Sequence, residues 1–303
     1  MVAHLKIAVT GGTGFVGARL IRALQRGGHQ VRALTRRPQD DSGGLTWIGG
    51  SLEEPDALAR LAESMDGLIH VAGVINADAA GFEAGNVHGT ASVLDAARSQ
   101  GVPRFVHVSS LAAREPQLSR YGASKARSED LVRESGLDYA IVRPPAVFGP
   151  GDLETLELFR MAKRGLVLLP PEGRLSLIHA DDLARLLIAL ASAKDPPRLV
   201  EPDDGKPGGW THRELAAALG DAVGRKGIAL SMPRPAMRFG AMLDGLIRRG
   251  SAKLTPDRAA YFCHPDWVAD PALVPPSSLW KAAIDTREGL RATREWYQEH
   301  RLL

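Results

Sequence analysis

Tyr121 and Lys125 stand four residues apart in the segment YGASK, a spacing that places both side chains on one face of a helix. A phenol with an ordinary pKa of about 10 exchanges protons poorly at neutral pH. A nearby ammonium stabilises the phenolate and lowers that pKa. The segment VSS (108–110) ends the strand-like run before this helix, and a serine hydroxyl there can bind the substrate oxygen that Tyr121 would protonate. Together these residues predict acid–base chemistry at a substrate oxygen.

A glycine-rich turn, VTGGTGFVG (9–17), follows the apolar run Leu5–Val9. Its glycines satisfy both the G-x-G-x-x-G and the G-x-x-G-x-x-G spacing. Either spacing lets the backbone approach a pyrophosphate without a Cβ, while a helix beginning near Phe15 offers free N–H groups and the positive end of its dipole. The strand before the turn and the helix after it favour a dinucleotide site over the alternative, a tightly packed structural corner.

The end of the second strand bears on the choice of cofactor. An NAD site usually carries Asp or Glu at this place to hold the ribose 2′-hydroxyl. Here the sequence reads LTRRP, with Arg36 and Arg37 after Thr35. Guanidinium groups can hold a 2′-phosphate through paired hydrogen bonds. The pattern favours NADP over NAD, with an exposed basic turn as the alternative.

Composition and charge bound the class of protein. The chain has 303 residues and a formal net charge of only +3, which argues against a nucleic-acid-binding surface. Its single cysteine, Cys263, excludes an internal disulfide and fits a reducing compartment. We see no signal peptide, and the apolar run 183–193 is too short to span a bilayer and contains Arg185. The histidines lack metal-ligand spacing, so we expect no metal site. The preceding features together indicate a cytoplasmic protein with no membrane span.

Strand-like and helix-like runs alternate through the first half of the chain, which predicts a doubly wound parallel Rossmann sheet. The expected strands are 6–10, 30–36, 45–50, 67–73, 104–110 and 138–144, and the expected helices are 14–28, 55–65, 86–100 and 121–135. After Pro144 proline and glycine become dense, but RLVEP (198–202) reads as a last strand of the main sheet. We expect a dinucleotide-binding domain over 1–145 with about 180–203, and a smaller, mainly helical substrate-binding domain over 146–179 and 204–303.

These motifs resemble those of the extended, or atypical-extended, members of the short-chain dehydrogenase/reductase superfamily. The matching segments follow one another in the order expected for that family: TGGTGFVG (10–17), HVAG (70–73), NVHGT (86–90), VSS (108–110), YGASK (121–125), RPPAVFGPGD (143–152) and IHADDLA (178–184). The C-terminal segment EGLRATREWYQEHRLL (288–303) also resembles the end of such chains. The resemblance therefore covers nearly the whole sequence.

The resemblance implies roles for the reactive residues. Tyr121 would be the general acid and base, and Lys125 would tune it while holding the nicotinamide ribose. Ser110 would bind the reacting oxygen, with Ser109 as the alternative because the two serines leave the register open. Asn86 would fix helix-to-sheet packing.

The resemblance also implies contacts with the cofactor. The pyrophosphate would rest on Gly11, Thr13, Gly14, Phe15, Val16 and Gly17. Ala72 and Gly73 would lie on the adenosine side, and Pro144 through Val147 would line the nicotinamide. Where the family usually has Asp followed by an apolar residue, this chain has Ser51 and Leu52, which leaves Leu52 as a backbone contact and weakens the contact to the adenine amino group.

We expect an NADP-dependent oxidoreductase that moves a hydride between the nicotinamide and a carbonyl or alcohol carbon of an apolar small-molecule substrate. In its sequence pattern the chain is similar to the dihydroflavonol-reductase-like and 3β-hydroxysteroid-dehydrogenase-like members. A nucleotide-sugar epimerase or dehydratase on retained NAD is one alternative. A non-catalytic NADP-binding subunit, similar to the accessory subunit of respiratory complex I, is another. Many relatives are dimers, so a homodimer is also expected.

The segment 232–250 is amphipathic, with Met237, Met242, Leu243, Leu246 and Ile247 set among arginines. Such a segment suits a lid over an apolar substrate or a contact with an anionic membrane surface. An ordinary helix of the smaller domain explains the same pattern, and the sequence leaves these alternatives open.

Overall fold

The protein is described here by a computed structural model, which covers residues 4–248 and 255–303. The chain forms two compact units. The first unit contains residues 1–144, 180–202 and 273–281, and the second contains residues 145–179, 203–272 and 282–303. The main chain therefore passes several times between the units, and residues 273–281 return to the first unit although the sequence analysis assigned them to the second region.

The first unit is built on a seven-stranded parallel sheet. Its strands are β1 (Lys6–Thr10), β2 (Gln30–Thr35), β3 (Leu45–Gly49), β4 (Gly67–His70), β5 (Phe105–Val108), β6 (Tyr139–Val142) and β11 (Leu199–Val200). The spatial order is β11-β6-β5-β4-β1-β2-β3, so the winding of the chain reverses between β1 and β4. This doubly wound order confirms the predicted fold class, including the return of the segment 198–202 to the main sheet.

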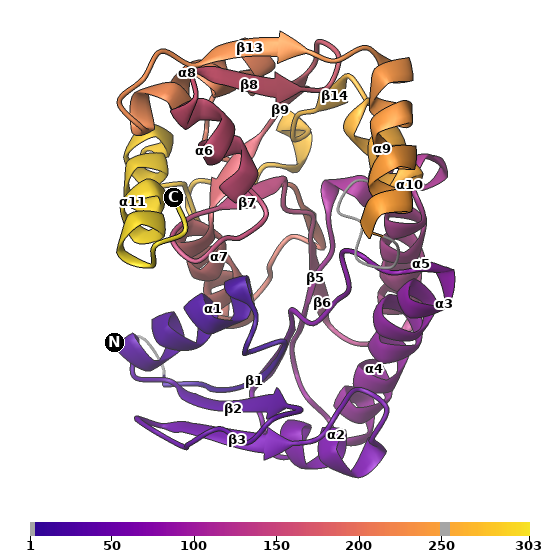
Figure 1. The fold of residues 1–303 in the computed structure, drawn as a ribbon. Helices are drawn as coiled ribbons and strands as arrows, with labels where there is room; N and C mark the ends of the chain where they lie inside the picture. The colour runs from indigo at the N-terminus through magenta and orange to yellow at the C-terminus, as the bar shows by residue number, and fades with distance from the viewer. Residues whose placement is uncertain (1–3, 249–254) are drawn as a thin grey trace. The chain divides into compact units, whose positions relative to one another are not determined.

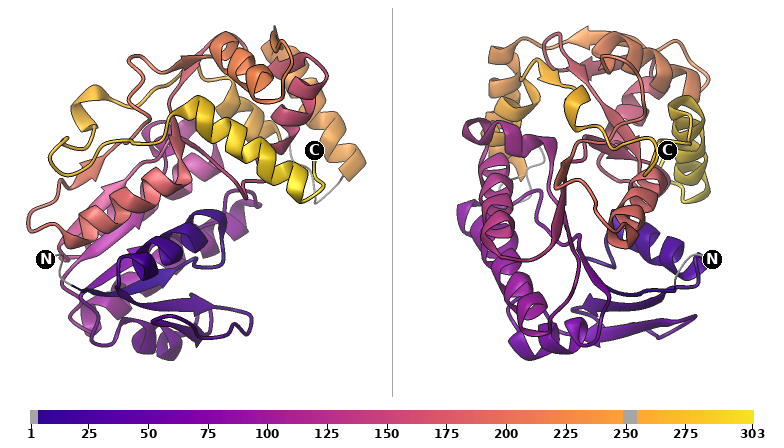
Figure 2. Two further views of the ribbon diagram at one scale, coloured as in Figure 1. Left: turned by 90° about the vertical axis from the view of Figure 1, so that its left-hand side faces the viewer. Right: turned by 180° about the vertical axis from the view of Figure 1, so that it is seen from behind.

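Helices cover both faces of this sheet. They are α1 (Phe15–Arg26), α2 (Pro55–Ala62), α3 (Ala79–Phe82), α4 (Gly89–Ser99), α5 (Arg120–Glu134) and α7 (Ala180–Ser192), with the short turns η1 (Glu83–His88), η2 (Leu111–Arg114) and η3 (Pro116–Leu118). Helices α1 and α7 pack together on one face, while α2, α4 and α5 lie on the other (Figures 1 and 2). Because both faces are covered, strands β4 and β5 are buried at every position.

The helix predicted for 86–100 differs from the observed one. The chain turns into α3 at Ala79, passes through the π-turn η1, and continues as α4 from Gly89. The side chain of Asn86 reaches from η1 to the Val74 backbone, where its Oδ1 accepts from the Val74 amide at 2.7 Å and its Nδ2 donates to the Val74 carbonyl at 2.9 Å. The extra residue of a π-turn accommodates such local contacts, and hydrophobic periodicity does not reveal it.

The second unit combines small sheets with helices. Its strands are β7 (Ala146–Phe148), β8 (Leu166–Leu169), β9 (Arg174–Leu175), β10 (Leu177–His179), β12 (Trp210–Thr211), β13 (Ile228–Ser231) and β14 (Asp266–Trp267). Its helices are α6 (Leu156–Lys163), α8 (His212–Ala222), α9 (Arg234–Arg248), α10 (Pro256–Phe262) and α11 (Thr286–Glu299). The turn η5 (Pro271–Leu273) ends at the first residue of the segment 273–281.

Helices α6, α8 and α11 enclose the core of the second unit. Phe159 and Tyr297 are fully buried, and their rings meet edge to face with centroids 5.2 Å apart. The Tyr297 hydroxyl donates to the Asp152 carbonyl at 2.6 Å, which satisfies a polar group that would otherwise be costly to bury. A capping box between Thr211 and Glu214 fixes the beginning of α8.

Candidate functional site

The glycine-rich turn between β1 and α1 has no room for larger residues at two positions. Gly11 has a φ of +74°, and a Cβ there would lie 2.6 Å from the Ala72 amide nitrogen. A Cβ on Gly17 would lie 2.0 Å from the Gly11 carbonyl oxygen. The Gly14 amide donates to that same oxygen at 3.0 Å and closes the turn. The turn thus brings β1, β4 and α1 into close contact at the point where the strand order reverses.

The beginning of α1 is open to a ligand. Gly14 caps the helix without a side-chain hydrogen bond, and the first turn contains no acidic residue. Thr13 and Gly14 are exposed, whereas Phe15 and Val16 are half-buried. A helix end of this kind presents backbone N–H groups and a positive dipole end, which suits an anionic group such as a pyrophosphate.

The loop after β4 lies against this turn and against α5. The Ala72 amide donates to the Thr10 hydroxyl at 3.3 Å. A Cβ on Gly73 would lie 3.2 Å from Asn86 Oδ1 and 3.7 Å from Lys125 Nζ. Residue 73 therefore lies between the buried Asn86 amide and the Lys125 ammonium, and a side chain there would crowd both.

Leu52 packs into the same side of the sheet. A Cβ on Gly89 of α4 would lie 2.7 Å from Leu52 Cδ1, so the glycine admits the leucine side chain. Leu52 also packs against the core formed by α2, α4 and the central strands. Its side chain is half-buried and serves as a packing element, and the expected backbone contact with the cofactor stays a prediction.

Tyr121 lies at the beginning of α5, which packs directly against η2, the segment that follows β5 and Ser110. Ser119 caps α5 by accepting the Gly122 amide at 3.0 Å. A Cβ on Gly122 would lie 2.6 Å from the Ala112 carbonyl oxygen, so the glycine permits close packing of α5 on η2. Ser110 is the N-cap residue of η2. Tyr121, half-buried in the first turn of α5, packs its ring 6.0 Å from that of Phe82.

Lys125 is buried one helical turn beyond Tyr121, which is about 6 Å along the helix axis. Only 4% of Lys125 is exposed, and its Nζ donates to the Val108 carbonyl at 2.7 Å. Burial lowers the pKa of Lys125 to about 8, although the nearby Glu129 carboxylate raises it. A group in this state is still mostly a cation at neutral pH and can act on a neighbouring phenol.

The two serines at the end of β5 have different partners. Ser109 Oγ donates to Glu129 Oε1 at 2.6 Å, so its proton is engaged in the interior. Ser110 Oγ accepts from the Ala112 amide at 3.2 Å, an arrangement that leaves its own O–H able to donate. This difference favours Ser110 over Ser109 as a donor to a bound oxygen.

A buried ion network stands behind these residues, and the sequence analysis missed it. Glu129 and Glu201 are both fully buried, and Arg143 donates to each of them. Arg114 pairs with Glu201 at 3.2 Å and Arg133 with Glu129 at 2.7 Å. Burial opposes ionisation, but the hydrogen bonds and charge of Arg143 hold the pKa of Glu129 below its usual value. The four-residue spacing of Glu129 from Lys125 is a sequence signal that could have indicated part of this network.

Two histidines lie beneath the site as neutral packing residues. His70 and His107 are paired across β4 and β5, and their rings stack with centroids 5.4 Å apart. Burial and the nearby Lys125 charge lower the pKa of His70 to about 3 and that of His107 well below its usual value. His70 is bonded to the hydroxyls of Thr10 and Thr90.

Arg36 and Arg37 follow β2 and are both exposed. The Thr35 hydroxyl donates to the Arg37 carbonyl at 2.7 Å and accepts from the Arg37 amide at 3.2 Å, which fixes the turn. Both guanidinium groups therefore begin from a defined backbone at the carboxyl edge of the sheet, beside β1 and its glycine turn.

Pro144 and Val147 fall in different units. The Pro144 carbonyl accepts the Leu111 amide at 3.1 Å, which ties Pro144 to the Ser110 segment of the first unit. Val147 lies in β7 of the second unit, opposite Ile178 of β10. Pro144 is thus held next to the Ser110 segment, and the expected roles of Pro144 and Val147 at the nicotinamide both stay predictions.

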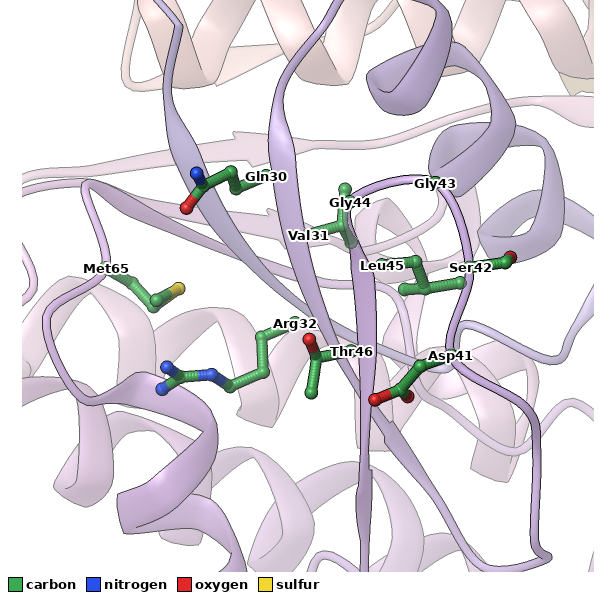
Figure 3. A pocket seen from close by; sticks show the side chains of 10 residues that line it. All are labelled: Gln30, Val31, Arg32, Asp41, Ser42, Gly43, Gly44, Leu45, Thr46 and Met65. Atoms are coloured by element: carbon green, nitrogen blue, oxygen red, sulfur yellow. The ribbon is translucent and has the colours of Figure 1, made fainter.

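A hollow in the first unit lies away from these residues. It has a volume of about 430 Å³ and is lined by residues from the amino ends of β2 and β3 and the loop between them, together with Met65 (Figure 3). Ligands of doubly wound sheets bind at the opposite, carboxyl edge. Arg32, which lines this hollow, donates to the carbonyls of Arg60 and Glu63. We therefore do not assign the hollow to the cofactor.

Across residues 4–248 and 255–303, no group of three or more histidine, cysteine or acidic side chains could hold a metal ion. The helices in these ranges are all too short or too polar to cross a membrane.

The amphipathic segment 232–250 contains α9. Met237 is buried, whereas Phe239 and Met242 are 64% and 63% exposed. The side chains of Leu243, Leu246 and Ile247, which the sequence analysis placed on the same apolar face, lie outside the described residues. The lid and membrane alternatives for this segment stay predictions.

The profile of the NAD dependent epimerase/dehydratase family matches residues 7–201. The ceramide reductase of Caulobacter vibrioides is 38% identical over 96% of this chain and 94% of its own length. The 2-alkyl-3-oxoalkanoate reductase of Stenotrophomonas maltophilia is 30% identical over 88% of this chain and 91% of its own length.

Solved structures share the fold at lower identity. The Bordetella bronchiseptica enzyme WbmG, in complex with NAD and UDP, gives a TM-score of 0.75 at 19% identity over 99% of this chain and 97% of its own. MoeE5, in complex with UDP-glucuronic acid and NAD, gives 0.73 at 22% identity over 97% of this chain and 99% of its own. Identities this low establish a shared fold and leave the substrate open.

Proposed function

This chain belongs to the NAD dependent epimerase/dehydratase family, and from that premise we propose that it is an NADP-dependent reductase of a ketone carbonyl on a long-chain, apolar substrate. Membership of the family confirms the resemblance to the extended short-chain dehydrogenases and reductases found in the sequence, and with it a nicotinamide cofactor. One observation carries the proposal: the Lys125 ammonium is buried beside Gly73, one helical turn from Tyr121, in a helix that begins against the Ser110 segment.

Three side chains divide the work at the substrate oxygen. Ser110 donates a hydrogen bond that orients the ketone oxygen. Tyr121 donates its phenolic proton to that oxygen as negative charge develops there. The Lys125 cation stabilises the phenolate that remains, and the Val108 carbonyl holds its Nζ in place at 2.7 Å. The product is the alcohol, and Tyr121 regains its proton from solvent.

The residues around the glycine-rich turn fit a dinucleotide. Gly11 and Gly17 form a cradle that a Cβ would fill, and the amides at the beginning of α1 suit a pyrophosphate, with Thr13, Phe15 and Val16 around it. When bound, a reduced nicotinamide supplies the hydride that the ketone carbon accepts. Ala72 and Gly73 would lie on the adenosine side, and Pro144 and Val147 near the nicotinamide.

Arg36 and Arg37 carry the choice of NADP over NAD. Both side chains are exposed at the carboxyl end of β2, where a carboxylate would otherwise hold a ribose hydroxyl. A 2′-phosphate can accept paired hydrogen bonds from such guanidinium groups.

The apolar substrate is supported by the relatives that span most of the chain. One is named for the reduction of a ceramide and the other for the reduction of a 2-alkyl-3-oxoalkanoate, and both names describe molecules with hydrocarbon chains. A homodimer and a cytoplasmic location stay predictions.

The proposal is tested by supplying NADPH and a long-chain 3-oxoacyl lipid to the purified protein. We expect NADPH to be consumed and the 3-hydroxy product to appear by mass spectrometry. Tyr121→Phe should lower the rate by about 10²- to 10⁴-fold while NADPH still binds, because it removes only the proton donor. A Tyr121→Phe protein as active as the parent would refute the mechanism. Protein that instead arrives with NAD bound and interconverts nucleotide sugars would refute the reductase assignment.

A further inference from the structure

Strands β8 and β13 of the second unit form a parallel pair with one exposed apolar face. Ile228 lies opposite Leu166, and Leu230 lies opposite Leu168. These four side chains, which we call the β8–β13 face, are 42% (Leu166), 40% (Leu168), 54% (Ile228) and 48% (Leu230) exposed. Because side chains alternate along a strand, all four project from the same side of the pair.

The other side of the pair is an ordinary core surface. Val167 and Leu169 of β8 are buried in the core that α6 and α8 help to form, and Ala229 of β13 packs against it. The strands run near α6 and α8 along the edge of the second unit (Figure 1). The pair is therefore anchored on one side, and its other side carries large apolar residues in solvent.

Exposed apolar residues gathered in this way need an explanation. Parallel strands are normally covered on both faces. Single exposed leucines are common, but a contiguous group of large apolar side chains usually marks a contact site.

Cations border one end of the β8–β13 face. Lys163 and Arg164 precede β8, and Arg225 and Lys226 precede β13. Since the two strands are parallel, all four residues lie at the same end of the pair, and all four are exposed. In the part of the chain that the structure describes, no carboxylate forms an ion pair with any of them. The nearest acidic residue along α8, Asp221, is paired with Arg287.

We propose that the β8–β13 face docks on a lipid bilayer with anionic headgroups. The four apolar side chains enter the boundary between headgroups and acyl chains, and the four cations bind lipid phosphates beside them. An apolar surface bordered by cations matches a bilayer in both respects, because anionic headgroups lie directly over hydrocarbon. A second copy of the chain fits less well, since it would bring the same cations to both sides of the interface.

This site goes beyond the proposed reductase and does not depend on it. It would bring the protein to the surface where long-chain lipids reside. The test reads vesicle binding alone, so failure of the catalytic proposal and failure of the docking proposal are separate results.

The experiment is flotation of the full-length protein with vesicles. One set contains phosphatidylcholine only, and the other contains equal parts of phosphatidylcholine and phosphatidylglycerol. We expect the protein to float with the second set, to remain mostly unbound with the first, and to dissociate from the second as salt is raised. A protein that floats with neither vesicle set overturns the proposal.

Two matched pairs of variants locate the contact. Leu168→Gln/Leu230→Gln removes apolar area from the face. Its control is Leu153→Gln/Val274→Gln, which removes apolar area from residues elsewhere that are 56% and 42% exposed.

Arg225→Glu/Lys226→Glu reverses two of the cations, and its control is Arg22→Glu/Arg291→Glu, with the same change in net charge. We expect each test variant to weaken partitioning into the phosphatidylglycerol vesicles by about tenfold or more, and each control by less than about twofold.

An unchanged unfolding temperature shows that a variant is folded. If the leucine variant is not folded, the charge-reversal variant locates the contact. Test variants that float as well as the parent overturn the proposal. Analytical ultracentrifugation excludes the competing occupant. A parent that is a dimer, and that Leu168→Gln/Leu230→Gln converts to a monomer, assigns the face to a second copy and overturns the proposal. A parent whose oligomeric state the leucine variant leaves unchanged supports it.

Discussion

Two of the parallel sheets in this protein, the seven-stranded sheet and the β8–β13 pair, expose different parts of themselves. In the seven-stranded sheet, β4 and β5 are buried at every position, because helices cover both faces. In the β8–β13 pair, buried and exposed residues alternate along β8, because helices cover one face only. A sheet covered on both faces can meet a ligand only at its edge, whereas a half-covered sheet can meet a partner with a face.

The functional candidates follow this division. At the carboxyl edge of the large sheet lie the glycine turn after β1, Gly73 after β4 and Ser110 after β5, all polar or backbone groups. The β8–β13 face offers side chains without polar atoms. The first arrangement suits a charged cofactor and proton transfer, and the second suits an apolar surface.

Paired alanine substitutions on adjacent strand residues test this difference most strongly. Leu68 and Ile69 of β4 point to opposite faces and are both buried, so Leu68→Ala and Ile69→Ala should each cost about 2–5 kcal/mol of unfolding free energy. Leu168 and Leu169 of β8 also point to opposite faces, but only Leu169 is buried. Leu169→Ala should cost about 2–5 kcal/mol, whereas Leu168→Ala should stay within about 0.5 kcal/mol. Urea unfolding of the four variants measures these values.

The same four variants can also contradict the difference in coverage between the two sheets. A Leu168→Ala variant that is destabilised as much as Leu169→Ala in dilute solution means that the β8–β13 face is covered in the isolated protein. The contrast between the two sheets would then disappear.

The two serines test the edge of the large sheet. We expect Ser110→Ala to lower kcat/KM by about 10²-fold, because it removes a donor aimed at the reacting oxygen. Ser109→Ala leaves the buried Glu129 oxygen without the donor now 2.6 Å away, so it should cost about 1–3 kcal/mol of stability with little change in kcat. Steady-state kinetics combined with urea unfolding separates the two effects. If Ser109→Ala instead lowered kcat/KM and Ser110→Ala instead lowered stability, the catalytic hydroxyl would be that of Ser109.

Much of the edge could be predicted from the sequence because its determinants are local. Glycine spacing between a strand and a helix requires a tight turn, and alternating runs that are apolar throughout require a sheet covered on both faces. The order of the strands then brings segments such as 10–17, 70–73 and 108–110 to one edge. Local patterns and chain topology were therefore enough for the fold class.

What the sequence could not provide depends on contacts between distant residues. Ser109 and Ser110 are chemically identical, and only the position of Glu129 on α5 separates them. The ion network joins Glu129 to Glu201, which is 72 positions later in the chain, through Arg143. The exposure of Leu166 and Leu168 could not be predicted either, because an apolar strand has the same sequence pattern whether or not a helix covers its second face.

The pH dependence of Lys125 gives opposite trends for activity and stability. Its pKa is about 8 in the folded protein against an ordinary value of 10.5, chiefly because burial disfavours the charged form. Above about pH 8 the cation is lost from the folded site, and we expect kcat/KM to fall by up to about tenfold per pH unit. Between about pH 8 and 10.5 the unfolded chain binds more protons at this residue than the folded one. The contribution of Lys125 to stability should therefore increase with pH over that range.

Lys125→Met supplies the control for both trends. It removes the titrating group, so the difference in unfolding free energy between parent and variant should change from pH 7.5 to pH 9.5 in favour of the parent, by about 1 kcal/mol or more. A difference independent of pH would show that Lys125 keeps an ordinary pKa. The edge of the large sheet would then lack its proposed cation of lowered pKa.

The smallest expected effect concerns the cofactor's 2′-phosphate. Arg36 is exposed at the end of β2, at the same carboxyl edge as the glycine turn. We expect the parent to bind NADPH about tenfold more tightly than NADH, and Arg36→Ala to remove most of that preference, a change of about 1.4 kcal/mol. Arg22→Ala on α1 matches the loss of charge away from this edge and should leave the preference intact. Fluorescence titration with both cofactors measures it. If Arg36→Ala keeps the preference and Arg37→Ala loses it, the neighbouring guanidinium holds the phosphate. If the parent prefers NADH, the basic end of β2 is only an exposed turn, and the edge binds the dinucleotide through its glycines alone.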